Sequence, residues 1–221
     1  MTTLVTSPEH LTTVAADESL QPAINQIIEE MIAALPDPKT LSAEARRGII
    51  ARYSSVLEGN FIYWMTATLI ATQSEDAKPI LLENLHEEVR DSHPHMLRKF
   101  YMAAHAVPTA EDALAVDEDL MNVRLFLGRL SAVQSLLTMG FFEGYIQKFM
   151  PYLAKLAADQ GSTEMEYTDV HGVCDIAHTA GLFQALASEM AVNPLGPGKD
   201  IFEGVHMLRA LLEHIVYSDA K

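Results

Sequence analysis

Two histidines and one aspartate lie within an otherwise apolar stretch, "VHGVCDIAHTAGLFQALA", at residues 170–187. On a helix that turns by about 100° per residue, Asp175 lies about 40° and His178 about 20° around the axis from His171, so all three share one face. Burying such groups is costly unless something binds them. Imidazole and carboxylate together are ligands for iron, manganese or zinc. The spacing therefore predicts either a metal site or a hydrogen-bonded polar cluster.

Two other stretches carry groups of the same kind. "LTMGFFEGYI" places Glu143 in an apolar run, where a carboxylate needs a cation or an arginine to offset its desolvation. "LLENLHEEVRDSHPHMLRKF", residues 81–100, holds three histidines and several carboxylates. If a helical bundle joins these stretches to His171, Asp175 and His178, they would provide ligands for two metal ions.

The elements that would position these residues are helical almost throughout. Apolar residues recur at helical spacing, Pro and Gly clusters mark the ends of the helices, and no segment alternates as a strand would. The predicted helices are 20–35, 43–72 with a bend near Gly59, 76–91, 93–105, about 120–158 with a kink near Gly140 or Pro151, one between "DQGSTEME" and "NPLGPGKD", and 200–217. The segment 107–120 is predicted to be a connection. The fold class is therefore all-α, as one domain over 19–221 after a flexible tail at 1–18.

Composition limits the classes of function. The chain has 30 acidic and 15 basic residues, which disfavours nucleic acid and anionic membranes as partners. It has a single cysteine, no apolar run of about 18 residues and no basic start of a signal peptide, so we expect a cytoplasmic location. A homodimer is compatible with this composition, but no stretch specifies its interface.

The three polar stretches, in their order along the chain, resemble the haem-oxygenase-like diiron oxidases and oxygenases. The resemblance covers about residues 75–190. It depends on "NLHEE" followed by "HPHMLRKF", on "GFFEGY", and on "HGVCDIAH", which reproduces the His-x3-Asp-x2-His of that family. It implies a haem-oxygenase-like bundle of about seven helices that binds two Fe(II) ions instead of haem.

Transferred residue by residue, the resemblance implies an iron-ligand set of Glu88, His93, Glu143, His171, Asp175 and His178. His95 is the alternative to His93, because it lies seven residues after Glu88 and hence on the same face of a continuous helix. Glu87 is the alternative to Glu88. Cys174, between two of these ligands, is expected to point away from the metal.

The resemblance also implies an activity. O2 would be the co-substrate, with an external electron donor as an option, for N-oxygenation, desaturation or C–C or C–N cleavage of an amino-acid-like or fatty-acid-like metabolite. A chlamydial member forms para-aminobenzoate from its own side chain. Its first-helix tyrosine is missing from "EEMIAAL" and its lysine is replaced by Leu153, so we expect an external small-molecule substrate here. The pocket walls are predicted at Tyr53, Tyr63 and Phe142, with Arg90 or Arg124 as candidates to bind a substrate carboxylate.

Three other interpretations compete with this one. Glu58, Glu83-x2-His86, Glu143 and Glu203-x2-His206 can be arranged as a ferritin-like diiron set. Haem oxygenase itself would need an axial histidine on the first helix, and only His10 precedes His86. A non-catalytic helical binding or scaffold protein of the same fold is the third.

Overall fold

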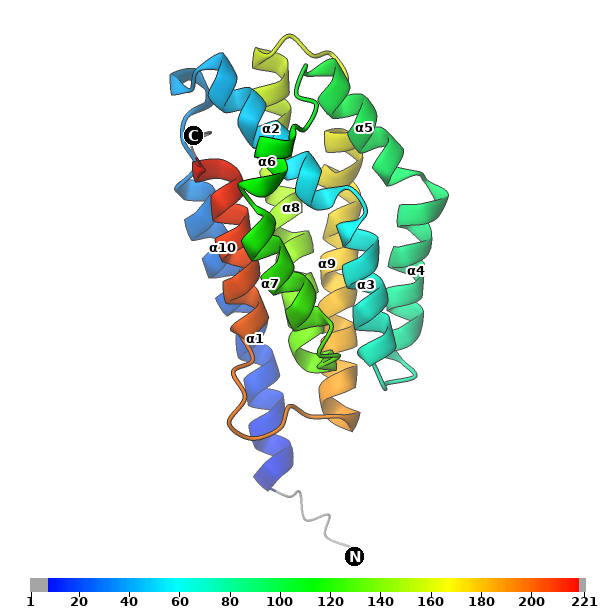
Figure 1. Ribbon diagram of the computed structural model, residues 1–221. Coiled ribbons are helices and arrows are strands. Elements are labelled where there is room, and N and C mark those ends of the chain that lie inside the picture. Colours follow the sequence, from blue (N-terminus) through cyan, green and yellow to red (C-terminus); the bar gives the residue numbers. More distant parts are fainter. Residues whose placement is uncertain (1–7, 219–221) are drawn as a thin grey trace, which may run out of the picture.

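The computed structural model describes the backbone of residues 8–218 and the side chains of residues 19–218. Within this part the chain is all-α, with ten α-helices, one short 3-10 helix and no strand (Figure 1). The elements are α1 (Pro8–Ala33), η1 (Pro38–Thr40), α2 (Ala43–Leu57), α3 (Asn60–Ala71), α4 (Ala77–Arg90), α5 (His93–Ala103), α6 (Ala110–Leu114), α7 (Asp117–Leu127), α8 (Ala132–Asp159), α9 (Glu166–Val192) and α10 (Glu203–Tyr217).

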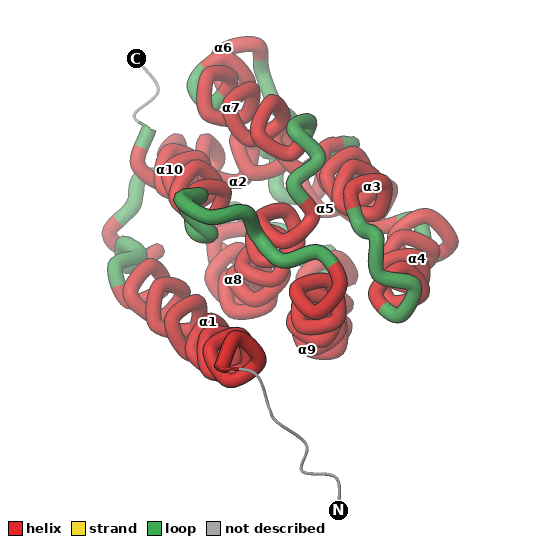
Figure 2. The backbone as a smooth tube through the Cα atoms, turned by 90° about the horizontal axis from the view of Figure 1, so that it is seen from below, coloured by secondary structure: helices red, strands yellow, loops and turns green. Residues whose placement is uncertain are grey.

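The bundle is organised around α8. In both views α1 and α10 lie on one side of α8, and α9, α4 and α5 lie on the other (Figures 1 and 2). The pair α8 and α9 makes the most extensive packing between elements of the described chain. The helices that carry "GFFEGY" and "HGVCDIAH" are therefore side by side.

There are more helices than the seven expected, because predicted helices are divided. Gly59, at φ 84°, adopts the left-handed conformation between α2 and α3, where a bend was expected. The stretch predicted to run from about 120 to 158 instead breaks at 128–131, where Leu130 has φ 54°. Gly140 and Pro151 both lie inside α8. The predicted connection 107–120 contains α6 and the start of α7.

The expected boundary at residue 18 stays a prediction. Residues 8–18 belong to α1, whose backbone is helical from Pro8 onward. Residues 1–7 lie outside the described residues.

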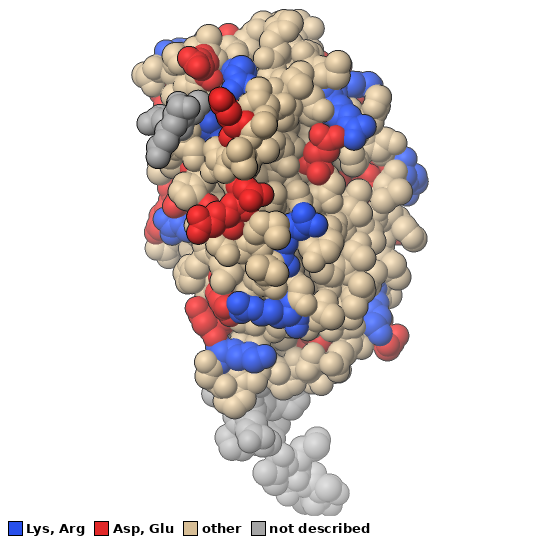
Figure 3. All heavy atoms as spheres, in the orientation of Figure 1, with Lys and Arg blue, Asp and Glu red and all other residues tan. Residues whose placement is uncertain are grey.

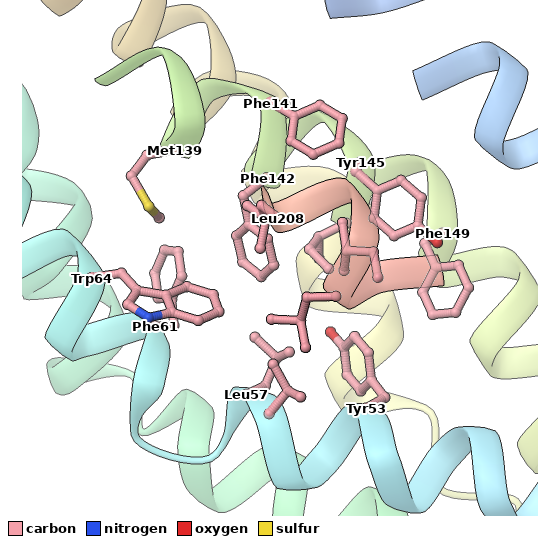
Figure 4. Packing of buried hydrophobic residues seen from close by; sticks show 14 of the residues in the cluster. Tyr53, Leu57, Phe61, Trp64, Met139, Phe141, Phe142, Tyr145, Phe149 and Leu208 are labelled. Atoms are coloured by element: carbon pink, nitrogen blue, oxygen red, sulfur yellow. The ribbon is translucent and has the colours of Figure 1, made fainter. Parts of the chain in front are cut away.

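Aromatic side chains form the core next to α8 (Figure 4). Phe142 stacks on Phe61 with 5.6 Å between ring centroids and meets Trp64 edge-on at 5.4 Å. Both partners come from α3, so these contacts fix α3 against the middle of α8. The next residue along α8 is Glu143, whose depth in the bundle is set by this packing.

The surface mixes both signs of charge. Figure 3 shows basic side chains lying among acidic ones on the face in view, separated by wide uncharged areas. None of the described helices is both long enough and apolar enough to cross a bilayer.

Gly204 is required where α10 approaches α7 and α8. A Cβ atom there would lie 2.2 Å from both Phe126 Cε1 and Thr138 Oγ1, so these buried side chains or the helices that carry them would have to shift. We expect Gly204→Ala to lower the free energy of unfolding by about 1–3 kcal/mol through overpacking. Gly172→Ala is the control, because a Cβ on that helical glycine meets nothing within 4 Å. Urea unfolding of both variants checks this, and an unchanged Gly204→Ala midpoint would contradict it.

Candidate metal centre

Four helices bring the six predicted ligands to one place. Glu88 comes from α4, His93 from α5, Glu143 from α8, and the other three from α9. All six side chains are buried, with His178 the most exposed residue at 9%. The burial of so many ionisable groups in one region requires either internal pairing or a bound cation.

The break between α4 and α5 decides which histidine joins the cluster. Asp91 ends α4, and Ser92 adopts the left-handed conformation at φ 58° before Pro94 enters the first turn of α5. This turn re-aims the chain so that His93 Nδ1 lies 2.7 Å from Glu88 Oε1. His95 is exposed. The alternative with His95 assumed a continuous helix, and the break removes that assumption.

The first half of the centre is formed by Glu88, His93 and His171. Each offers a ligand atom, and these atoms lie within 4.8 Å of one another. Glu88 Oε1 is 4.0 Å from His171 Nε2, while His171 Nδ1 lies 2.8 Å from the carbonyl oxygen of Tyr167. Because that carbonyl accepts the Nδ1 proton, His171 Nε2 is left to face Glu88.

The second half is formed by Glu143, Asp175 and His178. His178 Nδ1 lies 3.7 Å from Glu143 Oε1 and 3.6 Å from Asp175 Oδ1. Asn84 Nδ2 donates to Glu143 Oε1 at 2.8 Å. Cys174 is closer than expected, since its thiol donates to Asp175 Oδ1 at 3.2 Å and its sulfur belongs to a ligand-sized group with Asp175 and His178. The expectation that Cys174 points away from the site was wrong.

Several buried polar atoms of this cluster have no hydrogen-bond partner. They are Asp175 Oδ2, His178 Nδ1 and Asn84 Oδ1. Native proteins rarely leave such atoms unsatisfied. Carboxylate oxygen and imidazole nitrogen are metal ligands, so the donor set fits iron ions in this place.

The electrostatics of the cluster point the same way. Burial raises the pKa of Glu88, and burial together with Glu143 raises that of Asp175. Burial lowers the pKa of His171 to about 4, and His93 adds to the shift. Burial opposes the charge on His178, but the nearby carboxylates outweigh it and raise its pKa. The imidazole of His178, which lies nearest the carboxylates, therefore carries a positive charge. A bound metal ion would supply that positive charge in its place.

An apolar cavity of about 30 Å³ lies beside the centre. Five of the predicted ligands line it, namely Glu88, His93, Glu143, His171 and Asp175. The apolar residues of its lining include Leu57, Phe61, Ile62, Leu97, Phe142 and Ile146. Among the described residues that line it there is no Lys or Arg. The cavity lies where α2 ends and α5 begins.

The three residues predicted to form the pocket walls lie in different places. Phe142 lines the cavity. Tyr53 lies behind the wall, where its hydroxyl shares a 2.8 Å hydrogen bond with that of Tyr167, which does line the cavity. The prediction that Tyr63 lines the pocket was wrong. Tyr63 is 39% exposed, and the Arg124 guanidinium lies 4.9 Å from the centroid of its ring.

The two candidate carboxylate-binding arginines lie elsewhere. Arg124 is the cation above Tyr63, and Arg90 pairs with Asp91 at 2.8 Å on the surface. Neither lines the cavity.

The ferritin-like set is not brought together. Glu83, His86 and His206 are exposed. Glu203 pairs with Arg129 at 2.6 Å, and Glu58 pairs with Arg98. Only Glu143 of that set lies in the buried cluster, so that arrangement is excluded for these residues.

The contacts that Tyr167 and Glu87 make with the histidines of α9 were not predicted from the sequence. Tyr167, four residues before His171, packs its ring at 4.2 Å from the imidazole. Glu87, considered only as a substitute for Glu88, instead lies 2.8 Å from His178 Nε2. The helical spacing of Asn84, Glu87 and Glu88 on α4 was a usable signal, because residues three and four apart share a face.

Comparison with known proteins supports the chemistry of this centre. The sequence model of a family described as iron-containing redox enzymes, of haem-oxygenase-like type, matches residues 50–213. The chain belongs to this family. The matched region includes all six predicted ligands. No curated protein and no solved structure matches the chain significantly.

Replacing His93 and His95 separately distinguishes their roles. His93→Ala removes an imidazole that touches Glu88, so we expect bound iron per chain to fall by about one ion after anaerobic loading. His95→Ala is the matched control on the exposed face of α5 and should retain wild-type iron. Metal analysis of the desalted proteins measures both, and the opposite ranking would return the ligand role to His95.

Proposed function

We propose that this protein is a non-haem diiron oxidase or oxygenase that uses O2 to oxidise a small, largely apolar metabolite. Two groups of potential ligands carry the proposal. The ligand atoms of Glu88, His93 and His171 lie within 4.8 Å of one another beside an apolar cavity. His178 Nδ1 lies 3.6 Å from Asp175 and 3.7 Å from Glu143. Membership of the iron-containing redox family supports iron as the metal.

Charge balance favours two ions over one. Glu88, Glu143 and Asp175 are three buried carboxylates, and Glu87 is a fourth at the edge of the cluster. Two Fe(II) ions carry four positive charges and would neutralise all four. One ion would leave uncompensated negative charge in a region shielded from water, which is costly.

The enclosed part of the cavity fits small ions, water and O2, whereas a hydrocarbon chain would lie in the wider space among the lining residues, about 430 Å³ when the part open to solvent is included. About 30 Å³ holds roughly two water molecules. When bound, the iron pair supplies the electrons and open coordination positions with which O2 is activated.

The residues of the chain would have three roles in this reaction. The ligand side chains hold the metals at the inner end of the cavity. The apolar wall made by Phe61, Phe142 and Leu97 excludes water from that end. The hydroxyl pair of Tyr53 and Tyr167 keeps the Tyr167 ring in place against His171.

The cavity lining favours a fatty-acid-like over an amino-acid-like substrate. Most of the lining outside the predicted ligands is apolar, and it contains no Lys or Arg. The carboxylate of a fatty acid can stay in water while its chain enters, whereas both charged groups of an α-amino acid adjoin the carbon that would have to enter. A zwitterion entering this space would lose its hydration without a partner. A hydrocarbon chain would instead gain roughly 25 cal/mol for each Å² of apolar surface that it buries.

Iron loading followed by O2 tests the proposal. Anaerobic titration with Fe(II) should saturate at two ions per chain, and admission of O2 should then cause O2 consumption linked to iron oxidation. His178→Ala should lose at least 90% of this consumption, because it removes the imidazole among three carboxylates. His206→Ala is the control, since His206 is an exposed histidine on α10.

Three results would contradict the proposal. Saturation well below two irons would remove the diiron centre. Full O2 consumption by His178→Ala with loss in His206→Ala would favour the ferritin-like set. Iron binding without any reaction with O2 would favour a protein that uses the metal structurally.

A substrate panel tests the predicted chemistry of the cavity. The iron-loaded protein is offered medium-chain fatty acids and α-amino acids with O2, and product formation is followed by mass spectrometry. The pair of Fe(II) ions and the substrate would each supply two electrons to O2, so we expect about one product per diiron centre with the fatty acids. This yield should fall at least tenfold in Phe142→Asp, which places a charge in the apolar wall. Turnover confined to amino acids would contradict the assignment of an apolar substrate.

A further inference from the structure

We propose that Glu87 is a positioning residue which holds His178 so that its Nδ1, and not its Nε2, faces the metal. This inference rests on the proposed diiron function and assigns a role to a side chain outside the ligand set. Its single defining contact is the 2.8 Å approach of Glu87 Oε2 to His178 Nε2.

The two nitrogens of the His178 ring have different surroundings. Nε2 meets Glu87, whose side chain is 30% exposed at the edge of the cluster. Nδ1 is buried without a hydrogen-bond partner and faces Glu143 Oε1 at 3.7 Å and Asp175 Oδ1 at 3.6 Å. The ring is thus held from its outer side, and its inner nitrogen is directed to the carboxylates.

The side chains next to Glu87 on α4 also contact the centre. Glu87 and Glu88 are neighbours, and Glu88 contacts the first half of the centre while Glu87 contacts the second. Asn84, three residues before Glu87, donates to Glu143 of the same second half. One turn of α4 therefore contacts residues from α5, α8 and α9.

A carboxylate in this position has a known physical effect. A histidine that binds a metal through one ring nitrogen usually donates the other N–H to a carboxylate or carbonyl, which fixes its tautomer and orientation. His171 has the same arrangement with the Tyr167 carbonyl. Loss of such a support typically weakens metal binding by about 10–100-fold.

Replacement of Glu87 by glutamine and by leucine separates positioning from the other roles. Glutamine keeps an oxygen that accepts the Nε2–H but has no charge, whereas leucine removes the acceptor. Glu83→Gln is the matched control, because Glu83 is an exposed glutamate one turn earlier on α4. Anaerobic titration with Co(II), followed by its visible absorption, reports the affinity and coordination of each ion. Thermal unfolding of the metal-free variants reports whether the fold is intact.

We expect the wild type and Glu83→Gln to bind two Co(II) ions. Glu87→Leu should weaken one of the two ions by about 10–100-fold and leave the other unchanged, with the metal-free melting temperature retained. Glu87→Gln should stay within roughly threefold of wild type, because the hydrogen bond to Nε2 is kept.

Each other outcome overturns the inference in a distinct way. Equal losses in the glutamine and leucine variants would assign Glu87 a charge or direct ligand role. Wild-type affinities in Glu87→Leu would show that His178 needs no support, and the diiron function would stand. Loss of both ions with a lowered metal-free melting temperature would make the role structural. If the wild type itself binds fewer than two ions, the proposed function fails as well.

Discussion

The constraint on which this structure depends is the burial of three carboxylates, Glu88, Glu143 and Asp175, in one small volume. A carboxylate removed from water without a partner costs several kcal/mol, and neighbouring negative charges increase that cost. The imidazoles of His93, His171 and His178 offset part of it, but unsatisfied atoms remain on Asp175 and His178. A bound cation would offset the remaining desolvation cost, so we expect metal binding to raise the stability of the fold.

The rest of the bundle serves to hold this cluster in place. The close pairing of α8 and α9 sets Glu143 against the three predicted ligands of α9, and the stacking of Phe142 on α3 sets its depth. The turn at Ser92 then folds α5 back so that His93 meets Glu88. The left-handed region is an unfavourable conformation for a residue other than glycine, and Ser92 adopts it directly before the predicted ligand His93.

Local spacing was sufficient for the parts of the site that lie within one helix. His171, Asp175 and His178 share a face because of helix geometry alone, and their burial followed. The break between the helices predicted at 76–91 and 93–105 was foreseen. The left-handed conformation of Ser92, which places His93 and not His95 beside Glu88, was not, because serine rarely adopts that conformation. The predictions that Tyr63 lines the pocket and that the Cys174 thiol points away from the site were also wrong. Neither the exposure of a side chain nor its rotamer follows from helical spacing. The fold class was predictable from helical patterning, whereas the number of helices depended on breaks such as the one before α8.

The most direct test of the two-metal centre is a crystal structure of the iron-loaded protein with anomalous scattering measured at the iron edge. We expect two iron peaks, one contacted by Glu88, His93 and His171 and the other by Glu143, Asp175 and His178. A single peak, iron bound at Glu203 and His206, or a haem in the cavity would contradict it.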